Sequence, residues 1–219
     1  MNRMNFIEPN PCLLHLNIFQ KGLLSLLGIL GSLTSVAPTP THASEPARPA
    51  YESGDLLGKK VQALSKLEKT DCLGKQWSWA ELSGAKGTVL VFLGTECPLA
   101  KQYTPRISEL NNKYSDQGIR FVAVDPNIQD SLQEMAAHAR RFQFDIPFLK
   151  DPDQSLADLV GITRTPEVCL IDHENTIRYR GRIDDQYGIG FAREKPTQRE
   201  LAEAIEAVLA QRDVPTLQT

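Results

Sequence analysis

The sequence predicts an α/β fold in which a central mixed sheet is flanked by helices. Residues 89–93 form a run of β-branched and large apolar residues, which is typical of a strand buried on both faces. Residues 119–124 alternate apolar positions and form the next strand, and a helical pattern follows each of these two strands. Two such units indicate parallel strands joined by right-handed crossovers. Residues 167–171 and 176–182 add an antiparallel pair and make the sheet mixed.

The first of these helices begins at Pro98, directly after Cys97. Proline suits the first helical position, because that residue needs no amide hydrogen and proline already has the required φ. Pro105 lies within the helix and is expected to kink it. Apolar residues recur at intervals of three and four and give the helix one apolar face, which consists of Leu99, Tyr103, Ile107, Leu110 and Tyr114.

Cys97 is the candidate reactive residue. A helix N-terminus offers free backbone N–H groups and the positive end of the helix dipole, and both stabilise a thiolate. The adjacent carboxylate of Glu96 acts in the opposite direction, so we expect a reactive thiol if Glu96 points to solvent. The alternative is a buried, inert cysteine, because free cysteine is among the most buried residue types.

Helix and turn signals define the remaining elements. Residues 67–77 are expected to form a hairpin with Gly74 in its turn, and Gly161 to end a short helix over residues 151–160. His138 lies opposite an apolar helix face and is expected to be solvated. Capping boxes predict helix starts at Ser78, Ser131 and Thr197. The last two helices are expected to face inward through Leu132, Met135, Ala136 and Ala139, and through Leu201, Ile205, Val208 and Leu209.

The first 43 residues are expected to be a secretory signal peptide. Residues 22–41 carry no charge, and their apolar part is shorter than the roughly 20 residues that a membrane-spanning helix needs. Basic residues precede it, and small residues at Thr41 and Ala43 provide a cleavage site. A retained, tilted anchor is the alternative. Residues 44–57 are then expected to be a linker, 58–210 the folded domain and 211–219 a tail.

Charge and cysteine content narrow the class of protein. The formal net charge of −3 and the lack of a basic cluster argue against nucleic-acid binding. Cys12 would leave with the signal peptide, so three of the four cysteines remain, namely Cys72, Cys97 and Cys169. An odd number in an exported protein means that at least one thiol is free or pairs with another molecule.

The strand, the Cys97-Pro98 dipeptide and the helix with Pro105 resemble the active-site segment of the thioredoxin-like superfamily. The resemblance is closer to its redoxin branch, the AhpC/TSA-type relatives of membrane-linked thiol-disulfide oxidoreductases and peroxiredoxins. It covers roughly residues 58–210 and implies a thioredoxin-like fold with an N-terminal hairpin extension. The sequence departs from the Cys-x-x-Cys pair, which here is Cys97-Pro-Leu-Ala100, so the resolving cysteine is missing.

The resemblance also implies the residues around the thiol. A Thr-Pro pair directly before an apolar strand matches the cis-proline loop that packs against the active-site cysteine, with an ordinary trans proline as the alternative. Cys97 would be the nucleophile. The residues expected to present it and to shape the cleft are Thr95, Glu96, Pro98, Thr165 and Pro166.

Topology predicts a rim for this site. The strand after Pro166 begins at the cysteine end of the sheet, so its hairpin partner returns there and the loop over residues 183–195 should border Cys97. Residues 125–127 follow the carboxyl end of a parallel strand, the usual side for a site. The candidate rim residues are Asn127, Arg182, Asp184, Asp185 and Tyr187, with solvated loop charges as the alternative.

The cysteine positions predict a monothiol cycle. Cys169 lies three residues beyond Pro166, about 10 Å along the strand at roughly 3.3 Å per residue. A disulfide needs Cα atoms within about 7 Å, so Cys169 is expected to be a core residue. Cys72 would meet Cys97 only if its hairpin folded over the site. The expected intermediate is a mixed disulfide or sulfenic acid on Cys97 that an external thiol resolves.

The sequence thus predicts an exported, periplasmic or extracytoplasmic thiol-disulfide oxidoreductase whose partners are protein or small-molecule thiols and disulfides, without cofactor or metal. Peroxidase activity is disfavoured, because peroxiredoxins place threonine and arginine where this chain has Gly94 and Pro166. A non-catalytic docking module of an extracytoplasmic redox or electron-transfer assembly is the other alternative. Copper delivery of the Sco type is disfavoured, since there is no Cys-x-x-x-Cys.

Overall fold

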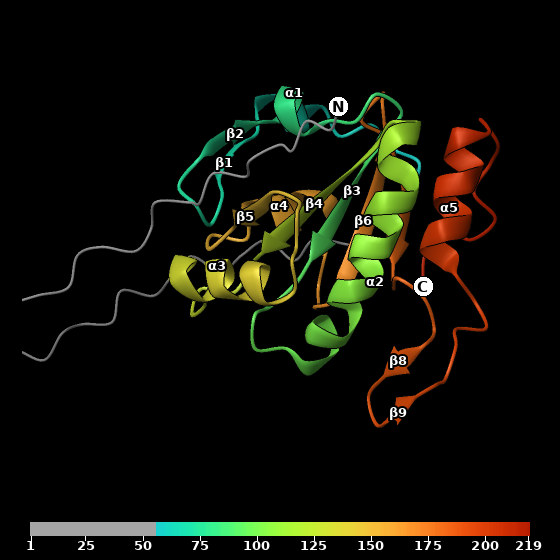
Figure 1. Cartoon of the computed structure of the whole chain (residues 1–219). Coiled ribbons are helices and arrows are strands. Elements are labelled where there is room, and N and C mark those ends of the chain that lie inside the picture. The colour runs from blue at the N-terminus through green and yellow to red at the C-terminus, as the bar shows by residue number, and fades with distance from the viewer. Residues whose placement is uncertain (1–55) are drawn as a thin grey trace, which may run out of the picture. The chain divides into compact units, whose positions relative to one another are not determined.

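The structure is a computed structural model that describes residues 56–219; the predicted signal peptide and most of the predicted linker lie outside the described residues. Its centre is a five-stranded sheet with the strand order β5-β4-β3-β6-β7 (Figure 1). Strands β3, β4 and β5 are parallel, and β6 and β7 are antiparallel to their neighbours, which confirms the predicted mixed sheet. The strands are β3 (Gly87–Phe92), β4 (Ile119–Asp125), β5 (Phe148–Lys150), β6 (Glu167–Asp172) and β7 (Ile177–Gly181).

Both faces of the central strand are covered, as its apolar run predicts. Val89 and Val91 point into a core cluster shared with α2 (Pro98–Tyr114), α3 (Leu132–Arg141) and α5 (Glu200–Leu209). Leu90 and Phe92 point into a second cluster, shared with the 3₁₀ turn η2 (Gln62–Lys66), α1 (Trp79–Leu82) and α4 (Ser155–Val160). Helices α2 and α5 lie next to each other over the first face (Figure 1). The fold is therefore a three-layer α/β arrangement.

The N-terminal hairpin forms as predicted from β1 (Glu68–Thr70) and β2 (Gln76–Ser78). Gly74 adopts a φ of +85° in its turn, a region that favours glycine. The carboxylate of Asp71 accepts the backbone N–H groups of Leu73 and Lys75, each at 2.9 Å, and the indole N–H of Trp77 at 2.8 Å. The predicted capping box at Ser78 opens α1.

Helix α2 runs without a break from Pro98 to Tyr114, so Pro105 does not end it. The hydroxyl of Thr104 donates to the carbonyl of Ala100 at 2.8 Å, one residue before the position that lacks an amide hydrogen. After α2, the short 3₁₀ helix η3 (Ser115–Gln117) leads to Gly118, whose φ of +93° turns the chain into β4. The cysteine strand and its helix thus have the predicted order.

The inward face of α3 is predicted wrongly in two respects. Leu132 is 39% exposed, whereas His138, expected in solvent, is 6% exposed. The helix is rotated so that its core face is centred on Met135 and His138. Two contacts hold His138 in the core. Its Nε2 is hydrogen-bonded to the Thr104 hydroxyl at 3.2 Å, and its ring packs on Phe142.

The start of α5 is also predicted wrongly. The expected capping box at Thr197 does not form, and the helix begins at Glu200. The backbone N–H of Thr197 donates instead to Asp185 at 2.7 Å, and Glu200 pairs with Arg182. The Thr197 N–H and the Glu200 carboxylate, which a capping box would join to each other, therefore bind Asp185 and Arg182 instead. A small hairpin of β8 (Tyr187–Gly188) and β9 (Phe191–Ala192) projects from this loop.

Both ends of the described chain pack against the sheet. Leu56 and Leu57, expected in the linker, are partly buried against the second core cluster. The expected tail runs alongside β7, where Gln218 bridges to Arg180 and the hydroxyls of Thr219 and Tyr179 are 2.9 Å apart. Within residues 56–219, no helix combines the length and apolar character needed to cross a membrane.

Candidate active site at Cys97

Cys97 occupies the cap position at the start of α2, between a buried strand and Pro98. Its backbone N–H donates to the carbonyl of Gly94 at 3.2 Å, and its own carbonyl accepts the N–H of Lys101 at 3.1 Å. The thiol donates to the carbonyl of Thr165, with 3.6 Å between sulfur and oxygen. Cys97 is partly buried against the first core cluster, so its sulfur is held at a defined point of the surface.

The Thr165–Pro166 peptide bond is cis. Both residues are partly buried and precede β6, whose first residue, Glu167, pairs in register with Phe92 at the end of the cysteine strand. The antiparallel register of β3 and β6 thus brings Thr165 beside Cys97. The predicted juxtaposition of the cysteine turn and the proline loop is present.

Glu96 points away from the thiol environment. Its side chain is 83% exposed and forms an ion pair with Lys101 at 3.3 Å. An exposed pair of this kind contributes little to stability, but it offsets the negative charge beside Cys97. Glu96 therefore points to solvent, as expected for a reactive thiol at Cys97.

Gly94 allows a close approach between the cysteine turn and the loop after β4. A Cβ atom at this position would lie 2.2 Å from Nδ2 of Asn127. Asn127 in turn donates from Nδ2 to Asp130 at 3.2 Å. Of the five candidate rim residues, Asn127 is therefore the one that the structure places against the cysteine turn.

Asp184, Asp185 and Tyr187 hold the loop in place, whereas Arg182 is exposed and pairs with Glu200. Asp184 is 2% exposed and its carbonyl accepts the hydroxyl of Tyr103, while Tyr187 packs edge-on against the Tyr103 ring at 5.1 Å. The Asp185 carboxylate accepts hydrogen bonds from Thr197 and Gln198. The hydrogen bond from the Thr197 side chain is the largest cause that lowers the pKa of Asp185 to about 2. Arg182 is engaged by Glu200. The alternative of solvated loop charges is therefore wrong for Asp184 and Asp185.

The loop nevertheless lies where topology predicts. The β8–β9 hairpin sits at the same end of α2 as Cys97 (Figure 1). The Tyr103 contacts fasten it to the first turns of α2, and Arg106 adds a hydrogen bond of 2.8 Å to Gln186. The loop therefore forms a wall near the site, with Asp184 and Asp185 buried inside it.

Position 100, where the resemblance would place a second cysteine, is a fully buried alanine. The three cysteines among residues 56–219 are all free. Cys169 is fully buried in β6, and burial strongly raises the pKa of its thiol. Cys72 is half-buried in the N-terminal hairpin, and burial raises its pKa as well. Because their pKa values are raised, Cys72 and Cys169 are less readily converted to the nucleophilic thiolate.

Sequence reasoning missed a cluster of charged residues behind the cysteine turn. Asp130 accepts the backbone N–H of Thr95 at 2.8 Å, the fully buried Asp125 lies beside it, and Lys150 Nζ is 3.7 Å from Asp125. Burial is the main cause that raises the pKa of Asp125 to about 7. A signal was available, because Asp125 and Asp130 flank the segment that follows the carboxyl end of a parallel strand.

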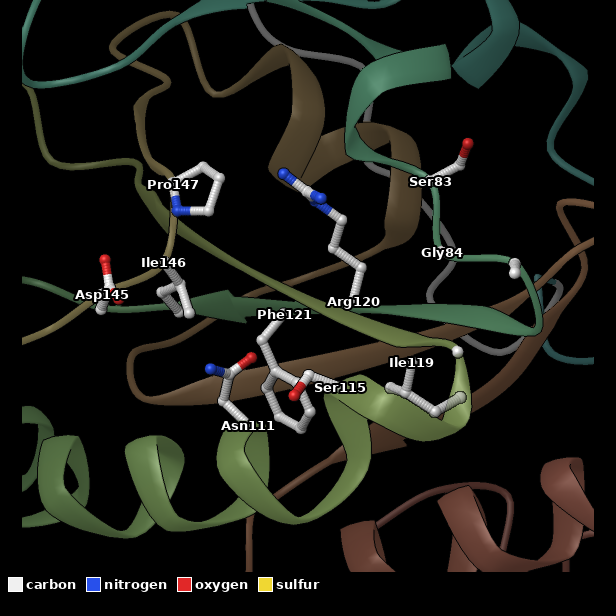
Figure 2. A pocket seen from close by; sticks show the side chains of 12 residues that line it. Ser83, Gly84, Asn111, Ser115, Ile119, Arg120, Phe121, Asp145, Ile146 and Pro147 are labelled. Atoms are coloured by element: carbon white, nitrogen blue, oxygen red, sulfur yellow. The ribbon is translucent and has the colours of Figure 1, made fainter. Parts of the chain in front are cut away.

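The cavity shown in Figure 2 belongs to a different part of the molecule. It has a volume of about 410 Å³ and lies at the start of β4, at the opposite end of that strand from Asp125. Arg120 and Phe121 extend to opposite sides of the strand there, and Asp145, Ile146 and Pro147 border it (Figure 2). A smaller cavity of about 220 Å³ is lined by Asn127 and Thr165, among other residues.

Residues 58–180 match the family model described as the AhpC/TSA family. The chain belongs to the AhpC/TSA family. This confirms the resemblance that the Cys97 segment indicates, and it covers the sheet, α2 and the cis-proline loop of this AhpC/TSA protein.

Named relatives of this AhpC/TSA protein are thiol-disulfide oxidoreductases. It is 29% identical over 107 residues to thiol-disulfide oxidoreductase ResA of Halalkalibacterium halodurans, covering 49% of this chain and 59% of the relative. It is 32% identical over 143 residues to thiol:disulfide interchange protein DsbE of Yersinia pestis, covering 63% and 71% of the two chains. The chain thus spans about three fifths of the length of the ResA relative.

Solved structures support the same fold. A hypothetical protein of Sinorhizobium meliloti 1021 matches with a TM-score of 0.65 and 27% identity, over 74% of this chain and 89% of that one. The structure of dsbF from Mycobacterium tuberculosis matches with a TM-score of 0.52 at 20% identity, which shows the fold alone. The thioredoxin-like fold predicted for this AhpC/TSA protein is confirmed.

Proposed function

We propose that this AhpC/TSA protein is a thiol-disulfide oxidoreductase that acts through Cys97 alone. The observation that carries the proposal is the position of the thiol, at the start of α2 and 3.6 Å from the carbonyl of Thr165. Thr95, Glu96 and Pro98 form the turn that presents it, and Thr165 and Pro166 form the opposite wall of the cleft. The names of the ResA and DsbE relatives support the same class of reaction.

The reaction is a disulfide exchange in two steps. The thiolate of Cys97 attacks one sulfur of a substrate disulfide, so that a Cys97–substrate disulfide forms, the substrate S–S bond breaks, and the leaving thiolate takes up a proton. An external thiolate then attacks the substrate sulfur of the mixed disulfide. It forms a new disulfide with the substrate and releases Cys97 as the thiolate.

Fixed groups of the chain favour the first step. The free N–H groups at the start of α2 and the helix dipole stabilise the thiolate at Cys97. The carbonyl of Thr165 accepts the thiol hydrogen; this orients the sulfur in the resting thiol, although it does not itself favour the thiolate. Resolution comes from another molecule, because position 100 is a buried alanine and Cys169 is buried in the sheet.

The proposal is tested by trapping the mixed disulfide. The purified protein is mixed with an aromatic disulfide that releases a coloured thiol, and the product is identified by intact mass and peptide mapping. We expect one released thiol per chain and one adduct on Cys97, lost in Cys97→Ser and retained in the matched variant Cys72→Ser. Labelling that requires unfolding of the protein contradicts the proposal.

A parallel reaction with hydrogen peroxide separates this function from a thiol peroxidase. Exchange with the disulfide that is much faster than oxidation by peroxide supports the oxidoreductase. Oxidation of Cys97 to a sulfenic acid that outpaces disulfide exchange supports the peroxidase instead. If neither reagent modifies the folded protein, the domain is a docking module.

We also propose that the protein is exported. The support is in the sequence: a charge-free apolar segment at residues 22–41, basic residues before it, and small residues at Thr41 and Ala43. The N-terminus of protein purified from the extracytoplasmic fraction tests this. A chain beginning near residue 44 supports cleavage, and an intact N-terminus in the membrane fraction supports a retained anchor.

A further inference from the structure

Two buried carboxyl groups lie directly behind the turn that carries Cys97. Asp125, the last residue of β4, has no exposed surface, and Asp130 is 4% exposed. Oδ2 of Asp130 accepts the backbone N–H of Thr95 at 2.8 Å, so this carboxylate is attached to the cysteine turn itself. Two acidic side chains are thus held together in a place that water hardly reaches.

The two carboxyl groups differ in their hydrogen-bond partners. Asp130 accepts both the Thr95 N–H and Nδ2 of Asn127, at 2.8 and 3.2 Å. Asp125 accepts the N–H of Asn127 through Oδ1 at 2.8 Å, but its buried Oδ2 has no hydrogen-bond partner among the described residues. A buried charged oxygen without a donor is costly. A proton on Asp125 removes that cost, because the acid then donates to Asp130.

The pKa directions agree with this assignment. Burial is the largest cause that raises the pKa of Asp125 to about 7. The neighbouring Asp130 raises this pKa further, while Asn127 and Lys150 lower it. For Asp130, burial is outweighed by the hydrogen bonds from Thr95 and Asn127, so its pKa is lowered. Two neighbouring acidic groups whose environments shift their pKa values in opposite directions hold one proton between them near neutral pH.

Two other titratable groups near the pair, His138 and Glu134, have lowered pKa values. Burial lowers the pKa of His138, and hydrogen bonds from the Ser131 backbone and side chain lower that of Glu134. The charged or titratable side chains that interact with the pair are Lys150 from β5, and Glu134 and His138 from α3.

We propose that Asp125 and Asp130 are positioning residues that share one proton and hold the cysteine turn, and that loss of this proton makes Cys97 less reactive. The proposal rests on the proposed role of Cys97. A second negative charge behind the turn disfavours the thiolate. It also repels Asp130 from the position in which that carboxylate accepts the Thr95 N–H.

The test compares alkylation of Cys97 by iodoacetamide as a function of pH in the wild type and in Asp125→Asn. The amide donates to Asp130 as the protonated acid does, but it cannot ionise. We expect a broadened profile in the wild type. In the variant we expect a single step with a lower midpoint, because no ionised Asp125 lies behind the turn to disfavour the thiolate. Asp116→Asn, an exposed aspartate in η3, is the matched control and should follow the wild type.

A second measurement is independent of Cys97 reactivity. The infrared band of a protonated carboxyl group is followed across neutral pH; we expect it to disappear in the wild type and Asp116→Asn, and to be missing throughout in Asp125→Asn. A wild-type alkylation profile in Asp125→Asn overturns the positioning role. A failure of Cys97 to react in any folded variant overturns the proposed function, while the infrared titration still decides whether the proton is shared. If Asp125→Asn does not fold, Asp130→Asn is used, because its amide oxygen can still accept the Thr95 N–H.

Discussion

The hydroxyl of Thr104 joins the backbone of the cysteine helix to His138 on α3. It donates its single hydrogen to the carbonyl of Ala100 at 2.8 Å, so it accepts from Nε2 of His138 at 3.2 Å. This assigns the hydrogen of the neutral imidazole to Nε2. The ring is 6% exposed and packs against Phe142 and Phe148. Through Thr104, helix α3 is thus hydrogen-bonded to the first turn of α2, which Cys97 caps.

The buried histidine predicts a loss of stability in mild acid. Burial lowers the pKa of His138 below its ordinary value, so the unfolded chain takes up this proton first as the pH falls. The stabilising contribution of the neutral ring is therefore complete above about pH 6.5 and is lost as the pH falls toward the folded-state value. We expect His138→Gln to reduce the free energy of unfolding more at about pH 7.5 than at about pH 5, measured by urea unfolding.

His173 provides the matched control for this prediction. It is exposed in the turn between β6 and β7, so His173→Gln should leave the pH dependence of stability unchanged. An equal loss of stability at both pH values in His138→Gln would mean that the ring contributes only by packing.

A second thiol at position 100 should convert the site to a dithiol. Ala100 lies three residues after Cys97, on the same face of α2, and is fully buried. We expect Ala100→Cys to form a disulfide with Cys97 on oxidation, at a cost of about 1 kcal/mol or more for the larger buried side chain. Intact mass before and after alkylation under denaturing conditions measures the bond.

Leu99→Cys is the matched control, because residues two apart on a helix do not face each other. With the three free cysteines of residues 56–219 and the new one, it should keep four free thiols under the same conditions, whereas a Cys97 disulfide in Ala100→Cys leaves two. If Ala100→Cys also keeps four free thiols, the start of α2 does not present position 100 to Cys97 as the Cys-x-x-Cys resemblance implies.

Gly94 and Asn127 should be energetically coupled. A Cβ at position 94 would lie 2.2 Å from Nδ2 of Asn127, so Gly94→Ala displaces that side chain from Asp130. We expect a destabilisation of about 1–2 kcal/mol and slower alkylation of Cys97. Asn127→Ala makes room for the methyl group, so the double variant should be more stable than the sum of the single losses predicts. Strict additivity in urea unfolding would place the two residues out of contact.

Arg182 should matter for stability and not for reactivity. It donates from Nε to Glu200 at 2.7 Å, and Glu200 is 6% exposed. Removal of Arg182 leaves a buried carboxylate without its cation. Because the arginine side chain is 43% exposed, water offsets part of this loss, and we expect Arg182→Ala to cost about 1–2 kcal/mol.

The alkylation rate of Cys97 in Arg182→Ala separates the two roles. A rate within twofold of the wild type fits a residue that anchors α5 to the loop before it. A tenfold slower alkylation rate at unchanged stability would mean that Arg182 acts at the rim of the site, as the sequence predicts.

Local pattern was sufficient for most of the fold. The apolar run of β3 is buried on both faces because each of its side chains must find a core, and alternation carries Val89 and Val91 to one cluster and Leu90 and Phe92 to the other. Pro98 and the capping boxes at Ser78 and Ser131 marked helix starts, because caps depend on residues three or four positions apart. Cys97 follows from the same helix start, whereas the Thr165-Pro166 pair follows from the family resemblance.

Tertiary contacts decided what local pattern could not. Thr197 and Glu200 have the residues of a capping box, but Asp185 and Arg182 compete for them, and neither competitor is visible in the spacing. His138 is buried because Thr104, on another helix, supplies a hydrogen-bond partner.

The sequence by itself determined the order of strands and helices, the place of Cys97 at a helix start and the absence of a second cysteine at position 100. Only the tertiary structure decided which charges face the site. Asp125, Asp130 and Lys150 come from the end of one strand, the following loop and the next strand, and they meet behind Thr95 because those segments share one edge of the sheet. Hydrogen bonds between residues distant in sequence depend on how the layers pack, and local periodicity carries no information about that packing.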